Sequence, residues 1–204
     1  MKNVMIAFDI KREGEKTPPG YKPVKLMMVY DIKMDFQRKA RLVARGDQTE
    51  PPNTLTYSSV VGRESVRIGL LVAAINDLDL EMFDIGNAYI TAPTTEKLYN
   101  TLGPEFGEDQ GKTARIIRAL YGLKSSGAAY RNHFANTLRE LGFKSCLADV
   151  DVWRRGSVKK DGTEYYEYIL CYVDDCLVIS DDPKIISRTL KDKLYNYVLK
   201  DEGV

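Results

Sequence analysis

The chain has 204 residues, of which 44% are hydrophobic and 29% are charged, and its formal net charge is +1. This balance is typical of a globular protein of one ordinary domain or slightly more, and nothing in it argues for a disordered chain or a fibre. No apolar run approaches the roughly 18 residues that a membrane span needs, and a net charge near zero argues against a stand-alone nucleic-acid binder without excluding a local basic lining.

The first 20 residues end in the breaker cluster Thr17-Pro18-Pro19-Gly20 and are expected to be a connecting arm rather than core. From Val24 to Met34 the apolar residues alternate, which predicts a strand. A turn around Asp35 leads to a second alternating stretch, Ala40 to Ala44, so a β-hairpin is predicted. One face of this hairpin is strongly basic, and its cations are Lys39, Arg41 and Arg45.

Two helices are predicted from apolar residues at helical spacing. The first runs from Arg63 to Asn76, with an apolar stripe made of Ile68, Leu71, Val72 and Ile75. The second runs from Ser126 to Leu141 and stops at Gly142, with a stripe made of Tyr130, Phe134, Leu138 and Leu141. Between them, alternating Leu78, Leu80 and Met82 predict a buried strand that ends in an acid, Asp84.

Two further strands are joined by the hairpin signal Asp161-Gly162. The second of them, Tyr165 to Tyr172, meets Asp174-Asp175, after which an apolar strand resumes. Asp182-Pro183 then begins a last helix, with a stripe made of Ile186, Leu190, Leu194 and Tyr197. Because strands and helices mix without a strict β-α-β rhythm, the predicted fold class is α+β.

The acid pair Asp174-Asp175 interrupts an apolar run, where an uncompensated charge is costly. One interpretation is a hairpin turn that uses Asp for its turn chemistry. The other is a cation site, because Asp84 also ends a strand and, if the two strands are neighbours, three carboxylates converge. Oxygen ligands of this kind suit Mg²⁺ or Mn²⁺ and would support two-metal phosphoryl transfer.

Cysteine and histidine offer little other chemistry. The three cysteines, Cys146, Cys171 and Cys176, include no C-x-x-C pair, so reduced and buried thiols are expected. His133 is the only histidine, which makes a histidine-based metal site or catalytic triad improbable. Catalysis should therefore rest on carboxylates, amines or hydroxyls.

Four motifs occur in an order that resembles the reverse transcriptases of copia-type (Pseudoviridae-like) LTR retrotransposons. They are Lys39 to Gly46, Phe83 to Tyr89, Arg118 to Gly127, and Tyr172-Val173-Asp174-Asp175. The resemblance implies the fingers and palm of a polymerase right hand, with an antiparallel palm sheet and helices packed on one face, and the thumb of the family is expected to be missing from this sequence. It divides the chain into a connecting arm (1–20), a fingers β-hairpin region (21–62), a palm with interleaved fingers segments (63–181) and a C-terminal palm helix (182–204).

The resemblance also implies roles for single residues. Asp84, Asp174 and Asp175 would be the catalytic metal ligands for two Mg²⁺ ions, with Mn²⁺ as a substitute and the carbonyl of Ile85 as a further oxygen. Tyr89 would exclude a ribonucleotide 2′-OH, or else be a packed helix aromatic. The other nucleotide-binding residues would be Lys39, Arg41, Arg45, Tyr121 and Gly122, and the template and primer contacts would be Lys124, Tyr172 and Val173. For the three cations, the alternative is a basic strand face that is simply solvated.

The activity implied is RNA-directed DNA synthesis within a retrotransposon Pol polyprotein. Its partners would be an RNA or DNA template-primer, dNTPs and the remaining Pol domains (thumb, RNase H and integrase), with no membrane. The location implied is cytoplasmic, in virus-like particles, with nuclear entry of the product. Two alternatives stay open: an inactive remnant that binds nucleic acid or nothing, and another two-metal enzyme such as a nucleotidyl cyclase, against which the fingers and Tyr-Gly-Leu-Lys motifs argue.

Overall fold

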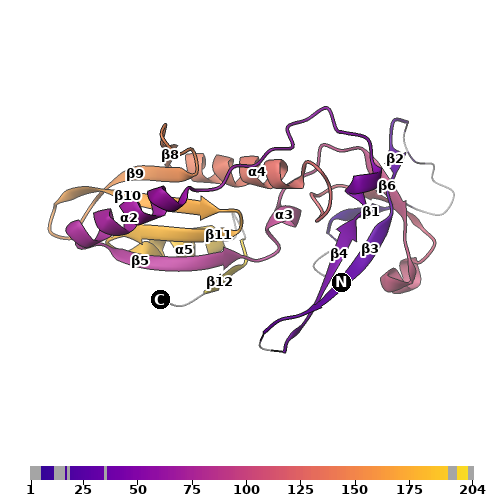
Figure 1. Ribbon diagram of the computed structural model, residues 1–204, viewed down its shortest axis with the longest axis horizontal. Coiled ribbons are helices and arrows are strands. Elements are labelled where there is room, and N and C mark those ends of the chain that lie inside the picture. The colour runs from indigo at the N-terminus through magenta and orange to yellow at the C-terminus, as the bar shows by residue number, and fades with distance from the viewer. Residues whose placement is uncertain (1–5, 12–16, 18, 35, 193–196, 202–204) are drawn as a thin grey trace. The chain divides into compact units, whose positions relative to one another are not determined.

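The computed structural model describes residues 6–11, 17, 19–34, 36–192 and 197–201. The described chain forms two compact units (Figure 1). Unit 1 contains the described residues of Met1–Tyr57 and Tyr89–His133, and unit 2 contains those of Ser58–Ala88 and Phe134–Val204. Both units combine sheet and helix, so a mixed fold of strands and helices is confirmed. None of the described helices is long and apolar enough to cross a membrane.

Unit 1 contains a four-stranded sheet and a separate β-hairpin. The sheet has the order β1-β7-β6-β2, and its strands are β1 (Phe8–Ile10), β2 (Lys22–Pro23), β6 (Leu98–Thr101) and β7 (Thr113–Ile116). The hairpin consists of β3 (Leu26–Ile32) and β4 (Arg38–Ala44). Two 3-10 helices, η1 (Gly46–Gln48) and η2 (Pro104–Asp109), complete the regular structure outside α4, together with the short helix α3 (Ala88–Thr91), which belongs to unit 1 from Tyr89 onward.

The prediction that residues 1–20 form a connecting arm rather than core is wrong for Ala7 and for Phe8–Ile10. Phe8–Ile10 forms β1 and pairs with β7, and Ala7 and Phe8 are buried in the core of unit 1. Phe8 packs edge-on against Phe106, with ring centroids 5.2 Å apart. A three-residue strand between polar segments has too short an apolar pattern to be recognised before its distant partner is known. Pro18 of the breaker cluster lies outside the described residues.

The β3–β4 hairpin forms as predicted, in a register that pairs Leu26 with Ala44 and Ile32 with Arg38. Its apolar face is buried only near the base, where Leu42 and Ala44 join the core of unit 1. Toward the tip the same face is exposed, because the hairpin extends past that core; the exposed residues are Tyr30, Ile32, Met34 and Phe36. Asp35 of the predicted turn lies outside the described residues.

Unit 2 is built on a six-stranded antiparallel sheet in the order β12-β5-β11-β10-β9-β8. Its strands are β5 (Asp79–Ile85), β8 (Lys144–Ser145), β9 (Val152–Val158), β10 (Glu164–Tyr172), β11 (Asp175–Ser180) and β12 (Leu199–Asp201). Its helices are α2 (Arg63–Ile75), the second half of α4 (Ser126–Glu140), and α5 (Pro183–Lys191).

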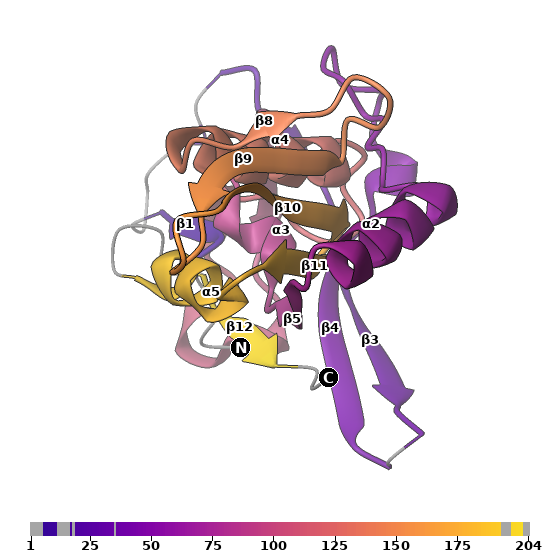
Figure 2. The same cartoon turned by 90° about the vertical axis from the view of Figure 1, so that its left-hand side faces the viewer.

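Helices cover both faces of this sheet (Figure 2). Helix α2 packs on the face that carries Leu170 and Ile179. Helix α4 lies on the opposite face, where the guanidinium of Arg139 sits 5.3 Å from the ring centre of Trp153. The prediction that helices pack on one face only is therefore wrong. The apolar run of β10 and β11 is buried on both sides, which a helix on each face explains.

Helix α2 forms as predicted, but its predicted apolar stripe does not face the core. Ile68, Leu71 and Ile75 are 61%, 59% and 73% exposed. The face in contact with the sheet has small residues instead: a Cβ added to Gly69 would lie 3.0 Å from Cδ1 of Ile179. The backbone of α2 lies so close to the sheet that only the helix face with small side chains fits against it. Hydrophobic spacing in the sequence does not distinguish this face from the wider apolar stripe.

The two later helices follow the prediction at their starts. Helix α4 buries Tyr130, Phe134 and Leu138. Helix α5 has proline at its first turn and ends at Lys191, earlier than the predicted stripe. Tyr197 is buried beyond the helix end and shares a 3.1 Å hydrogen bond with Thr137, whereas Leu194 lies outside the described residues.

Candidate functional site

The acid pair lies in the tight turn between β10 and β11. Tyr172 and Asp175 are the last paired residues, so Val173 and Asp174 make the turn. Val173 has a φ of 57°. A positive φ at the first turn position is normally the place of glycine, and a β-branched residue there is strained. Strain of this kind persists only where the surrounding structure enforces it, and it is concentrated at functional sites.

Asp84 lies directly opposite Asp175, in the register between β5 and β11. The backbone N–H of Ile85 donates to the carbonyl oxygen of Asp174 at 2.8 Å. Because antiparallel pairs alternate, the next pair, Asp84 with Asp175, is of the non-hydrogen-bonded kind, in which Cβ atoms lie about 4.5–5.5 Å apart. The two carboxylates thus project from the same face of the sheet at neighbouring positions.

A lysine flanks Asp84 on its other side. Strand β12 pairs Lys200 with Asp84, and the Nζ of Lys200 lies 3.2 Å and 3.3 Å from the two carboxylate oxygens of Asp84. Sequence reasoning missed this residue, because nothing local marks β12 as a partner of β5. The order across the sheet is therefore cation, acid, acid.

These residues suit a divalent cation in chemistry. Like charges placed directly opposite each other destabilise a strand pair, and a cation between them removes that cost. Carboxylates are the hard oxygen ligands that Mg²⁺ and Mn²⁺ prefer. In the described part of the chain, however, no group of three acids, histidines or cysteines is already arranged to hold a metal. Asp84 and Asp175 face each other, and Asp174 is in the turn beside them.

The other predicted residues of unit 2 surround the turn. Tyr172 is 56% exposed and precedes the turn at the end of β10. Ile85 is fully buried, and its N–H binds the turn as described above. The role of the Ile85 carbonyl as a ligand stays a prediction.

The predicted fingers cations differ in their surroundings. Arg45 lies just beyond β4 and donates to both oxygens of Asp47, from Nε at 2.9 Å and from Nη2 at 2.8 Å. This pairing raises the pKa of Arg45 and lowers the pKa of Asp47. Lys39 and Arg41 are half-buried on β4 and form no ion pair with any described residue. In the strand register, Asp31 lies directly opposite Lys39, and Val29 lies opposite Arg41.

The remaining predicted residues cluster in unit 1 around the loop before α4. The ring of Tyr89, in α3, lies 4.8 Å from the ring of Tyr121, centroid to centroid. Gly122 has a φ of +89°, and a Cβ at this position would lie 2.1 Å from the carbonyl oxygen of Ala44. Lys124 donates from Nζ to the carbonyl oxygen of Thr49 at 2.5 Å. The aromatic contact fits both interpretations of Tyr89, as a gate or as a packed side chain.

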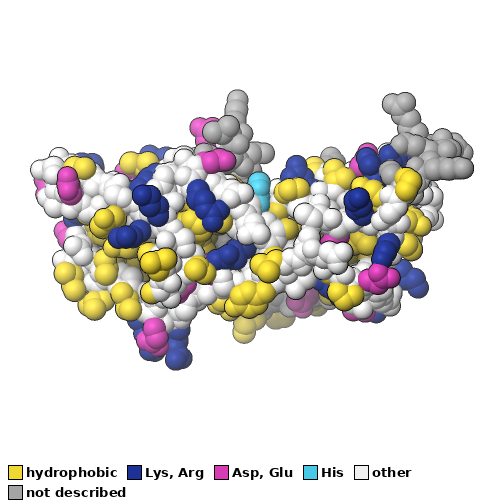
Figure 3. Space-filling model, turned by 90° about the horizontal axis from the view of Figure 1, so that it is seen from above, with side chains coloured by type: hydrophobic (Ala, Val, Ile, Leu, Met, Phe, Trp, Pro, Cys, Tyr) yellow, Lys and Arg dark blue, Asp and Glu magenta, His cyan; other side chains and the backbone are white. Residues whose placement is uncertain are grey.

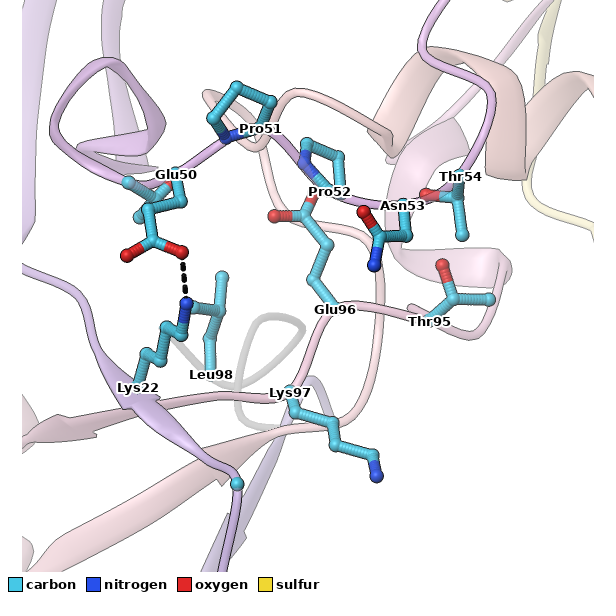
Figure 4. A pocket seen from close by; sticks show the side chains of 12 residues that line it. Lys22, Glu50, Pro51, Pro52, Asn53, Thr54, Thr95, Glu96, Lys97 and Leu98 are labelled. Atoms are coloured by element: carbon cyan, nitrogen blue, oxygen red, sulfur yellow. Dashed lines mark hydrogen bonds and ion pairs between the residues drawn. The ribbon is translucent and has the colours of Figure 1, made fainter.

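A polar pocket of about 270 Å³ in unit 1 contains none of the predicted residues (Figure 4). It is lined by Gly20, Lys22, the segment 49–54 and the segment 95–98, and Lys22 forms an ion pair with Glu50 in it. On the molecular face in Figure 3, basic, acidic and hydrophobic side chains are interspersed.

Comparison with known proteins supports the same family. Residues 14–204 match the family model described as reverse transcriptase (RNA-dependent DNA polymerase). The chain is 30% identical over 167 residues to the retrovirus-related Pol polyprotein from transposon RE1 of Arabidopsis thaliana, which covers 80% of this chain and 11% of that protein. It is 28% identical over 196 residues to the Pol polyprotein from transposon TNT 1-94 of Nicotiana tabacum, covering 91% and 14%.

A yeast protein is also similar. The truncated transposon Ty1-A Gag-Pol polyprotein of Saccharomyces cerevisiae is 33% identical over 172 residues, which covers 81% of this chain and 14% of that protein. The chain thus spans between 11% and 14% of the length of these three relatives.

Proposed function

Since this chain belongs to the reverse transcriptase (RNA-dependent DNA polymerase) family, of the copia type, we propose that it catalyses RNA-directed DNA synthesis. In this proposal it supplies the fingers and palm of the enzyme and adds deoxynucleotides to the 3′-OH of a primer. The observation that carries the proposal is the direct opposition of Asp84 and Asp175 beside the strained turn that contains Asp174.

The three acids would hold the metal. Asp84 and Asp175 offer oxygens from neighbouring strands, and Asp174 offers a third carboxylate from the turn. Two Mg²⁺ ions, or Mn²⁺ in their place, would lower the pKa of the primer hydroxyl and offset the charge of the leaving pyrophosphate. The work of the protein is to hold these carboxylates on a sheet of paired strands, where the register fixes their spacing.

Other residues would bind and select the nucleotide and the nucleic acid. Lys39 and Arg41 would bind the triphosphate, because neither forms an ion pair with a described residue, while Arg45 would first have to leave Asp47. Tyr89 would exclude a 2′-hydroxyl, next to Tyr121 and Gly122 as further nucleotide contacts. The template and primer would be contacted by Lys124, Tyr172 and Val173.

The proposed setting is a retrotransposon Pol polyprotein in cytoplasmic virus-like particles, where a thumb, RNase H and integrase would complete the enzyme. An alternative proposal is an inactive fragment that binds nucleic acid without catalysis. The absence of a preformed three-acid group among the described residues is the observation that keeps this alternative in view.

Primer extension on an RNA template tests the proposal. The chain should extend a DNA primer in Mg²⁺ or Mn²⁺, and Asp174→Asn should abolish extension because it removes one oxyanion ligand. Asp161→Asn is a matched control and should leave extension unchanged. Asp161 lies in the turn between β9 and β10, at the other end of β10, where it accepts a hydrogen bond from the N–H of Thr163 at 2.9 Å. Retention of extension in Asp174→Asn would refute the catalytic assignment, and template binding without any extension would favour the alternative.

A further inference from the structure

The contact between Lys200 and Asp84 places a cation of the chain itself on an acid proposed to bind metal. Lys200 Nζ lies at nearly equal distances, 3.2 Å and 3.3 Å, from the two oxygens of Asp84. Its side chain is 62% exposed, whereas that of Asp84 is 23% exposed. The ammonium of the pair is therefore mostly open to solvent, whereas the carboxylate is mostly shielded from it.

The contact is built into the sheet. Lys200 is opposite Asp84 in the ladder, and the neighbouring residues Gly86 and Val198 are joined by an N–H to O bond of 2.7 Å. Side chains of directly opposite residues project from the same face. Whenever β12 of this chain pairs with β5 in this register, the ammonium of Lys200 is therefore placed beside Asp84.

An ammonium and a divalent ion compete for the same oxygens. Both neutralise Asp84, but only the ammonium is covalently attached, and its presence repels a second cation a few ångströms away. An exposed lysine–carboxylate pair is weak, so the metal can displace the ammonium. The apparent affinity for the metal is lowered because the ion binds only the fraction of molecules in which the pair is broken.

We propose that Lys200 is a positioning residue that neutralises Asp84 in the metal-free chain and lowers the affinity of the acids for divalent metal until it moves away. This inference rests on the proposed function, because it needs Asp84 to be a metal ligand. It links metal binding to strand β12: when the ion binds, the Lys200 side chain is released from Asp84.

Binding of Mn²⁺ alone, followed by the electron paramagnetic resonance of free Mn²⁺, tests the proposal without any catalysis. Lys200→Met keeps the length of the side chain and removes its charge, and it should tighten Mn²⁺ binding by about three- to tenfold at low salt. Lys200→Arg keeps the charge and should bind Mn²⁺ as the native chain does. Lys184→Met, on α5, is the matched control and should change nothing, because α5 packs on the other face of the sheet.

The difference between the native chain and Lys200→Met should shrink as ionic strength rises, since exposed charges are screened. A purely structural role for Lys200 would not produce this salt dependence or the rescue by arginine. Circular dichroism on each variant checks that it is folded.

Asp84→Asn separates the two hypotheses. Suppose that the native chain binds Mn²⁺ and that Asp84→Asn no longer binds it. If Lys200→Met then binds Mn²⁺ no more tightly than the native chain, the inference about Lys200 is wrong while the proposed metal site stands. If neither the native chain nor Lys200→Met binds Mn²⁺ in a manner that depends on Asp84, both the inference and the proposed metal site are overturned.

Discussion

A buried ion pair on the face of the sheet opposite the acids allows a quantitative prediction. Glu167 is 5% exposed and accepts hydrogen bonds from Arg155, from Nε at 2.9 Å and Nη2 at 2.6 Å. Ser180 donates to its other oxygen at 2.9 Å. Glu167, on β10, therefore links β9 and β11, and β10 and β11 form the hairpin that contains Asp174 and Asp175.

Arg155→Met would leave the Glu167 carboxylate buried without its cation. Breaking a buried pair from one side costs about 3 kcal/mol, which corresponds to a fall in Tm of about 6–12 °C for a chain of this size. The cost is taken at the lower end of the roughly 3–5 kcal/mol that is usual for a buried pair, because the side chain of Arg155 is 31% exposed. Adding Glu167→Gln removes the unpaired charge, so the double variant should recover at least about 1 kcal/mol relative to the sum of the single variants.

Thermal and urea unfolding followed by circular dichroism measure these differences. Arg154→Met is the matched control: Arg154 is the preceding residue, exposed on the other face, and stacks on Tyr166 at 5.0 Å. It should cost only about 0.5–1 kcal/mol. Equal losses for Arg154→Met and Arg155→Met, or strictly additive losses for Arg155→Met and Glu167→Gln, would refute the reasoning.

Two further predictions concern the loop before α4 and the thiols. Gly122→Ala places a Cβ 2.1 Å from the carbonyl oxygen of Ala44, at a φ of +89°. It should lower the free energy of unfolding, measured by urea titration, by more than about 2 kcal/mol. An unchanged urea midpoint would contradict the described loop. Alkylation of the native chain should modify Cys146 first, because Cys171 and Cys176 are buried and the hydrogen bond with Cys171, together with burial, raises the pKa of the Cys176 thiol. Mass spectrometry of the labelled chain checks this order, and rapid labelling of Cys176 without denaturant would speak against it.

The local pattern alone determined several elements and drew attention to the acid pair Asp174-Asp175. The hairpin β3–β4, the helices α2 and α4, and the start of α5 at Pro183 follow from period, turn chemistry and helix-start signals that act over a few residues. The acid pair was conspicuous because two charges interrupt an apolar run, a signal that also needs no knowledge of distant contacts.

Only the tertiary structure decided which surfaces meet. Strand β1 depends on its pairing with β7, more than a hundred residues away, and the buried face of α2 depends on how closely Gly69 approaches the sheet. The placement of Asp175 opposite Asp84, and of Lys200 on the far side, depends on the register of β5, β11 and β12. Local propensity specifies that a segment is a strand, but its partner and register are set by non-local burial and pairing, so the cation beside Asp84 becomes visible only once the sheet is formed.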